Sequence, residues 1–148
     1  MKNLIYKIAI SAGAQKVWEI MLAPDTYQEW VNAAWPGSFY EGRWAEGENL
    51  RFIGKDGSGT LALLESYKPY TYISARHIAI LQSGGIEDRE SDIAKGWIGT
   101  TENYMFKDES GVTMLTVELI INPEWEKMFN EGWPKALARL KEICETGS

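Results

Sequence analysis

An alternating pattern of apolar and polar positions opens the chain. The apolar set that shares one face of this segment is Leu4, Tyr6, Ile8 and Ile10. A period of two predicts a β-strand over residues 4–11. The spacing then becomes helical in AQKVWEIML. Pro24 ends this helix. Asp25 and Gln28 then form a capping-box pattern for a second short helix, which carries Tyr27 and Trp30 and ends near residues 33–34.

Short apolar runs separated by glycine-rich turns fill the middle of the chain. They predict strands at residues 38–44, 49–54, 59–67, 70–82, 98–107 and 112–121. The turns YKPY and KDESG separate two pairs of them, so the strands are expected to form an antiparallel meander. The segment SGGIEDRESDIAKG, residues 83–96, is mostly polar and has no apolar period, and we expect a mobile loop there.

The last pattern is an apolar stripe at helical spacing. Asn122 is a good N-cap and Pro123 suits the first helical position. The stripe consists of Trp125, Phe129, Trp133, Leu137 and Leu140. A helix of about 20 residues is roughly 30 Å long, and one so apolar on one face must pack on a sheet. The prediction is an α+β fold in which a curved antiparallel sheet wraps around this helix, and the two early helices close one end of an internal cavity.

Composition adds a ligand hypothesis to this fold. The 148 residues are expected to form a single domain over residues 1–146. Seven Trp and seven Tyr exceed what such a core needs, and aromatic side chains also line ligand cavities. A net charge of −6 argues against nucleic acid and against an anionic membrane surface. No apolar run is long enough to cross a membrane, so no stable membrane insertion is expected.

The cysteine content and the N-terminus bear on the compartment. Cys144, the one cysteine, has no partner for an internal disulfide, which fits a reducing environment, and we expect it to be a small core residue. Lys7 interrupts the apolar run that a signal peptide requires. The expected location is therefore cytoplasmic.

Three stretches resemble a known family in their order and spacing. They are SAGAQKVWEIMLAPDTYQEW, GRWAEGENLRFIGKDGSG and GWPKALARLKEI, which together span nearly the whole chain. They are similar to the START-like, or SRPBCC, superfamily, which includes Bet v 1-type proteins and polyketide cyclases. Within it they most resemble the activator-of-Hsp90-ATPase-homologue-like branch. The resemblance implies a helix-grip fold with a cavity for an apolar or amphipathic small molecule, such as a lipid or a polycyclic compound.

The sequence departs from this branch in two places. Gly13-Ala14 stands where members often have Ser-Pro or Asp-Pro, which predicts a weaker cap for the first helix. The acidic loop at residues 85–95 is long for the branch and affects the expected mouth of the cavity.

The fold model yields a set of cavity residues. The second helix contributes Tyr27 and Trp30, the sheet Phe52, Ile73, Ala75, His77 and Tyr104, and the last helix Trp125, Met128, Phe129, Trp133 and Leu137. Trp18, Tyr27, Trp30 and Trp35 also admit a plain reading as core residues, whereas in the functional reading Tyr27 and Trp30 line the mouth of the cavity. In YISARHIAIL, a period of two places His77 on one face with Ile73, Ala75, Ala79 and Leu81.

Two polar residues are candidates for chemistry. His77 is the single histidine, and it is read as a ligand hydrogen-bonding group, as a general acid–base, or as a histidine with neither role. Glu102, on one face with Tyr104, either holds a polar head group or lies on the surface. One His and one Cys give no zinc site, and the acidic residues of 87–92 do not match a calcium loop. No metal, cofactor or catalytic residue is assigned.

These observations leave three functional hypotheses. The first is a carrier or sensor that binds a hydrophobic or amphipathic small molecule in the cavity. The second, implied by the resemblance, is a domain that modulates an Hsp90-type chaperone, which predicts an exposed apolar or charged patch outside the cavity. The third is a cyclase-like or hydrolase-like enzyme that uses the same cavity and depends on His77.

Overall fold

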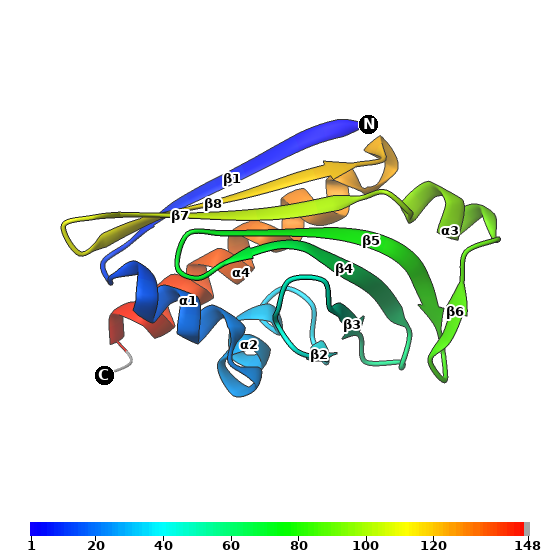
Figure 1. Cartoon of the computed structure of the whole chain (residues 1–148), viewed down its shortest axis with the longest axis horizontal. Coiled ribbons are helices and arrows are strands. Elements are labelled where there is room, and N and C mark those ends of the chain that lie inside the picture. The colour runs from blue at the N-terminus through cyan, green and yellow to red at the C-terminus, as the bar shows by residue number, and fades with distance from the viewer. Residues whose placement is uncertain (147–148) are drawn as a thin grey trace.

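The structure is a computed structural model, and it describes residues 1–146 (Figure 1). The strands are β1 (Lys2–Ile10), β2 (Phe39–Glu41), β3 (Asn49–Ile53), β4 (Gly59–Lys68), β5 (Tyr72–Gln82), β6 (Ile86–Asp88), β7 (Thr101–Glu109) and β8 (Val112–Ile121). The helices are α1 (Ala14–Leu22), α2 (Pro24–Val31), α3 (Asp92–Trp97), the 3-10 turn η1 (Pro123–Trp125) and α4 (Glu126–Thr146).

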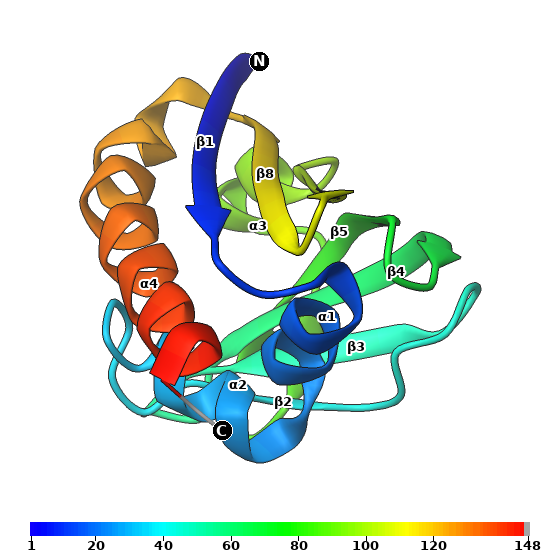
Figure 2. The same cartoon turned by 90° about the vertical axis from the view of Figure 1, so that its left-hand side faces the viewer.

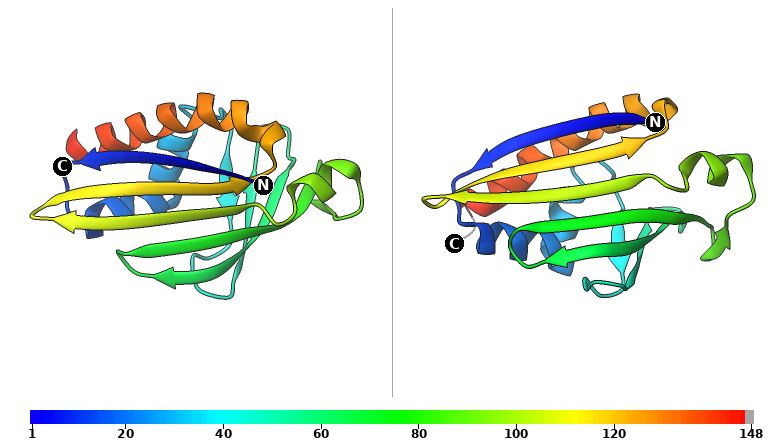
Figure 3. Two further views of the ribbon diagram at one scale, coloured as in Figure 1. Left: turned by 90° about the horizontal axis from the view of Figure 1, so that it is seen from above. Right: turned by 45° about the horizontal axis from the view of Figure 1, so that its top comes forward.

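Within residues 1–146 the eight strands form one antiparallel sheet; the antiparallel arrangement is as the sequence predicts, whereas β6 is a strand that the sequence did not predict. Its order is β1-β8-β7-β5-β4-β3-β2, and the short β6 pairs with β5 outside this path. The sheet bends around α4, which lies along its concave side (Figures 2 and 3). α1 and α2 lie across one end of the sheet (Figure 1). This is the helix-grip arrangement that the pattern of strands and helices predicts.

α4 packs on the sheet through the apolar stripe that its sequence shows. Asn122 is the N-cap residue before η1, and its side chain accepts a hydrogen bond from the amide of Glu124, so the predicted cap is confirmed. The buried residues of the helix are Phe129, Gly132, Trp133, Ala136, Leu137, Leu140, Ile143 and Cys144. Cys144 is a core residue as expected, and burial raises the pKa of its thiol to about 11. None of the described helices is long and apolar enough to cross a bilayer.

Gly132 allows an aromatic side chain to lie directly against α4. A β-carbon at position 132 would come within 2.5 Å of Cζ2 of Trp35. Trp35 follows α2 and packs on Trp133, with 5.6 Å between the ring centroids. Packing therefore explains the Gly-Trp pair at the start of GWPKALARLKEI: Gly132 leaves room for the ring of Trp35, and that ring contacts Trp133.

Replacing Gly132 with alanine tests this contact. Alanine favours the helix by about 1 kcal/mol. Overpacking against Trp35 costs about 1–3 kcal/mol, so we expect Gly132→Ala to lower the free energy of unfolding by up to about 2 kcal/mol. Urea unfolding followed by tryptophan emission measures this change. Glu131→Ala, at an exposed neighbouring position, is the control, and a Gly132→Ala protein more stable than wild type would contradict the packing role.

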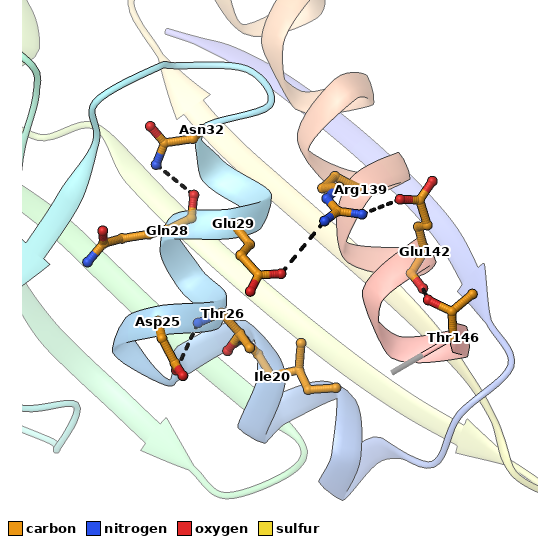
Figure 4. Close-up of polar contacts among 9 residues, drawn as sticks. All are labelled: Ile20, Asp25, Thr26, Gln28, Glu29, Asn32, Arg139, Glu142 and Thr146. Atoms are coloured by element: carbon orange, nitrogen blue, oxygen red, sulfur yellow. Dashed lines mark hydrogen bonds and ion pairs between the residues drawn. The ribbon is translucent and has the colours of Figure 1, made fainter. Parts of the chain in front are cut away.

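The two early helices form as predicted, but the predicted capping box is wrong. Pro24 takes the first position of α2 and Ala23 is its N-cap, so Asp25 lies inside the first turn and its carboxylate accepts from the amide of Thr26. The hydroxyl of Thr26 donates to the carbonyl of Ile20 at 2.5 Å and joins α2 to α1 (Figure 4). The helix also ends earlier than predicted, at Val31.

α2 is further connected to α4 by charge. Arg139 of α4 forms an ion pair with Glu29 of α2, 3.7 Å apart, and a second one with Glu142 (Figure 4). These side chains are exposed, so the pairs orient the helices more than they stabilise them.

The first helix is capped by a residue that is distant in the sequence. Gly13 has no capping side chain, in agreement with the weak local signal. The carboxylate of Asp108, in the β7–β8 hairpin, accepts a hydrogen bond from the amide of Ala14 at 2.9 Å. Hydrogen bonds from the amides of Ala14 and Gly111 hold the pKa of Asp108 below its ordinary value. A long-range acceptor thus replaces the local one.

A β-bulge in the β4–β5 pair corrects the predicted face of β5. Leu61 pairs with Ala79, but the next residue of β4 pairs with His77, which leaves Ile78 as an extra residue on β5. The extra residue reverses the alternation beyond it. Ala79 and Leu81 are buried, but they pack with Leu61 in a separate cluster, away from the main core that holds Ile73 and Ala75.

The segment at residues 83–96 is ordered structure, and the prediction of a mobile loop is wrong. It contains β6, which pairs with β5, and α3. The side chain of Ser91 caps α3 by accepting from the amide of Ala94. After the helix, the backbones of Gly99 and Thr100 hydrogen-bond to that of His77. The segment therefore brings Trp97, the last residue of α3, onto β5.

Candidate ligand-binding cavity

A cavity of about 540 Å³ lies between α2, α4 and the concave side of the sheet. It is lined by Tyr27, Trp30, Val31, Ala34, Trp35, Pro36, Ser38, Phe39, Phe52, Ile53, Gly54, Ser58, Gly59, Thr60, His77, Trp97, Glu102, Tyr104, Met128, Phe129 and Trp133. Most of these side chains are apolar or aromatic. The volume lies within the range of roughly 300–1,000 Å³ typical of small-molecule sites.

Eight of the twelve residues proposed from the sequence line this cavity. They are Tyr27, Trp30, Phe52, His77, Tyr104, Met128, Phe129 and Trp133. The expectation that the other four face it is wrong. Ile73, Ala75 and Leu137 are buried in the core outside the lining. Trp125 packs against Trp97, with ring centroids 5.5 Å apart, and is also outside the lining.

The cavity also contains residues that sequence reasoning did not assign to it. Trp97 enters from α3, which was predicted to be a loop, and Trp35 enters from the segment between α2 and β2. Thr60 and Glu102 come from strands on either side of β5. For Trp97 a signal exists in Ser91-Asp92, a cap residue followed by an acidic first turn.

Aromatic rings form a continuous wall from α2 across to α4. The ring centroid of Trp133 lies 6.0 Å from those of Trp30 and Tyr104. Tyr27 packs edge-on against Trp30 at 5.1 Å. The indole N–H of Trp30 donates to the carbonyl of Met21 at 3.0 Å, which fixes the ring. Such packing leaves these side chains few alternative rotamers, so the wall is pre-formed.

The mouth of the cavity is formed by other residues than those expected. Tyr27 and Trp30 are buried and lie in its interior. The exposed lining residues are Pro36, between α2 and β2, and Met128, whose exposed fraction is 39%. Trp18, by contrast, lies in the core against Tyr67 and Phe106, as the plain reading predicts.

A hydrogen-bonded polar cluster occupies one side of the apolar cavity. Nε2 of His77 lies 2.9 Å from Oε1 of Glu102, and Nδ1 lies 2.9 Å from the hydroxyl of Thr60. The hydroxyl of Tyr104 donates to Oε2 of Glu102 at 2.5 Å. Glu102 is therefore not a surface glutamate: its side chain is 14% exposed and that of His77 is 2% exposed.

The environment of Glu102 determines its charge. Burial opposes ionisation, but the hydrogen bond and charge of His77 and the hydrogen bond from Tyr104 outweigh it, so the pKa of Glu102 lies below its ordinary value. Burial, followed by the charge of Glu102, raises the pKa of both Tyr27 and Tyr104. A carboxylate therefore lies beside neutral phenols, and the imidazole next to it is placed to hold or transfer a proton.

The described residues do not form a metal centre. In residues 1–146 no group of three or more His, Cys, Asp or Glu side chains is arranged to hold a metal ion. The cavity chemistry is that of aromatic faces and one polar cluster.

A curved antiparallel sheet that encloses an apolar cavity with a long C-terminal helix defines the helix-grip class of domains. Residues 11–145 match the family model described as Activator of Hsp90 ATPase homolog 1-like protein. The chain belongs to this family, within the SRPBCC superfamily that the sequence resembles. Among curated protein sequences none matches the chain.

Solved structures show the same fold at low sequence identity. Protein MLL2253 from Mesorhizobium loti has a TM-score of 0.72 at 13% identity, and the match covers 96% of each chain. The Aha1 dimer from Colwellia psychrerythraea has a TM-score of 0.71 at 17% identity over 100% of this chain and 99% of that one. DynU16, a protein of the dynemicin biosynthetic locus, has a TM-score of 0.73 at 17% identity over 100% of this chain and 49% of that one.

Proposed function

We propose that this chain binds an apolar or amphipathic small molecule in the cavity. The observation that carries the proposal is the combination of about 540 Å³ of aromatic-lined space with one buried polar cluster. Small-molecule sites typically combine an apolar lining with a few polar groups that orient the ligand. The membership of the family and the likeness to a protein from a biosynthetic locus support the same proposal.

The experiment is native mass spectrometry of the chain purified gently from its own cells, repeated after denaturation. We expect an excess mass that denaturation releases. Met128→Trp places a large ring at the mouth and should lower the fraction of protein that carries the mass by at least about tenfold, or ~1.4 kcal/mol of binding energy. Lys127→Trp, at the exposed neighbouring position outside the lining, is the control.

Equal occupancy of the Met128→Trp and Lys127→Trp proteins would place the bound molecule outside the cavity and contradict the proposal. A bare polypeptide mass in the wild type, together with no binding of aromatic probes, would also count against it. These results would favour the second candidate function, which is described next.

The second candidate is modulation of an Hsp90-type chaperone, and the description of the family supports it. The structure has exposed apolar side chains outside the cavity, with Ile86 67% and Ile93 62% exposed. The test is the ATPase rate of such a chaperone with and without this chain. A change in rate that Ile86→Ser and Ile93→Ser abolish would favour this role.

A further inference from the structure

The cavity lining holds a single carboxylate among the described residues, that of Glu102. Among the described lining residues none is Lys or Arg, and apart from tyrosines the titratable side chains are His77 and Glu102. Oε1 of Glu102 lies within hydrogen-bond distance of Nε2 of His77, whose Nδ1 is beside the hydroxyl of Thr60. The described lining residues offer no Lys or Arg as a counter-ion for this carboxylate.

The carboxylate of Glu102 retains capacity for a further donor. Each of its oxygens has one protein partner, His77 for Oε1 and Tyr104 for Oε2. A carboxylate offers about four acceptor positions. Glu102 is among the residues that line the cavity, and its side chain is 14% exposed.

The aromatic wall also favours a cationic ligand. Trp97 packs edge-on against His77, with ring centroids 4.8 Å apart, and Tyr104 lies beside Trp133. The faces of Trp and Tyr rings attract cations within about 6 Å. The indole N–H groups of Trp97 and Trp133 have no acceptor among the described residues, but they are enclosed by protein and do not reach a ligand.

We infer that the cavity selects an aromatic or polycyclic amine, whose cationic N–H group donates to Glu102, and that it rejects carboxylates. This inference rests on the proposed function, since it names the chemical class of the ligand for the same cavity. A ligand carboxylate beside Glu102 would be a second buried negative charge with no Lys or Arg in the described lining to pair with it, which is costly in an apolar site. A neutral alcohol can donate to Glu102 but gains nothing from charge.

Three probes that share one ring system test this order. They are 2-naphthylmethylammonium, 2-naphthylmethanol and 2-naphthoate, titrated at pH 7 by isothermal calorimetry. We expect the ammonium to bind roughly tenfold more tightly than the alcohol, and the naphthoate to bind more weakly than either.

Glu102→Gln retains the size of the side chain and removes its charge. In this variant the preference for the ammonium over the alcohol should disappear. Glu131→Gln makes the same change in net charge at an exposed position of α4 outside the lining, and it should keep the wild-type order. The order in the wild type decides the inference even if the Glu102→Gln protein does not fold.

The outcomes separate the two proposals. If naphthoate binds as tightly as the ammonium, or if Glu102→Gln leaves the order unchanged, the inference is overturned while binding in the cavity stands. If none of the three probes binds, the proposed function itself is contradicted, and the inference is overturned with it. The expected order with its loss in Glu102→Gln supports both.

Discussion

Replacing Trp133 with alanine is expected to lower the free energy of unfolding by about 3–5 kcal/mol. Trp133 is 3% exposed, and its ring packs against four others. The distances between ring centroids are 6.5 Å to Tyr6, 6.0 Å to Trp30, 5.6 Å to Trp35 and 6.0 Å to Tyr104. Since domains of this kind have total stabilities of about 5–15 kcal/mol, the loss is a large part of the whole.

The measurement is chemical unfolding followed by far-UV circular dichroism, which does not depend on the deleted fluorophore. Met128→Ala is the matched control, because Met128 lines the same cavity from the same helix but is 39% exposed. It should change the stability by less than about 1 kcal/mol. Similar losses for Trp133→Ala and Met128→Ala would show that Trp133 does not hold the wall together.

Regular patterns allowed most of the fold to be predicted. The alternation in β1 repeats over several residues and the apolar stripe of α4 over several turns. A single residue that departs from such a long pattern therefore does not change the prediction. α3 was missed because its six residues span less than two helical turns, too few to show a repeating apolar pattern, and only its cap, Ser91, indicates it. The reversed face at Ala79 was missed because a single extra residue in β5 leaves no mark on the alternation.

Of the polar cluster, the sequence indicated His77, Tyr104 and Glu102 as separate candidates, but neither Thr60 nor the contacts among these residues. A period of two placed both His77 and Glu102 on faces that carry buried residues. Their contact depends on the order of the strands, since β7 follows β6 and α3 in the chain but pairs with β5. The register then places Glu102 opposite Ala75, diagonal to His77. The bulge next to His77 is equally invisible in the sequence, and it places Thr60 on the same face.

Glu102→Ala is expected to lower the free energy of unfolding at pH 7 by about 2–6 kcal/mol. Two buried donors, the imidazole N–H of His77 and the hydroxyl of Tyr104, lose their acceptor at once. Each unsatisfied group costs about 1–3 kcal/mol. Urea unfolding at pH 7 measures the loss, and Glu131→Ala, which removes an exposed carboxylate, provides the baseline.

The cost of Glu102→Ala should depend on pH with a definite sign. The pKa of Glu102 is lower in the folded chain than its ordinary value of 4.5. The unfolded chain therefore binds the proton first, so this carboxylate stabilises the fold fully above pH 4.5 and loses its contribution as the pH falls through the lower folded pKa. The difference between wild type and Glu102→Ala should be larger at pH 7 than at pH 3, because it shrinks as the pH falls below 4.5. An equal difference in the free energy of unfolding at pH 3 and pH 7 would contradict this prediction. It would mean that the stabilisation by Glu102 does not depend on whether its carboxyl group is ionised.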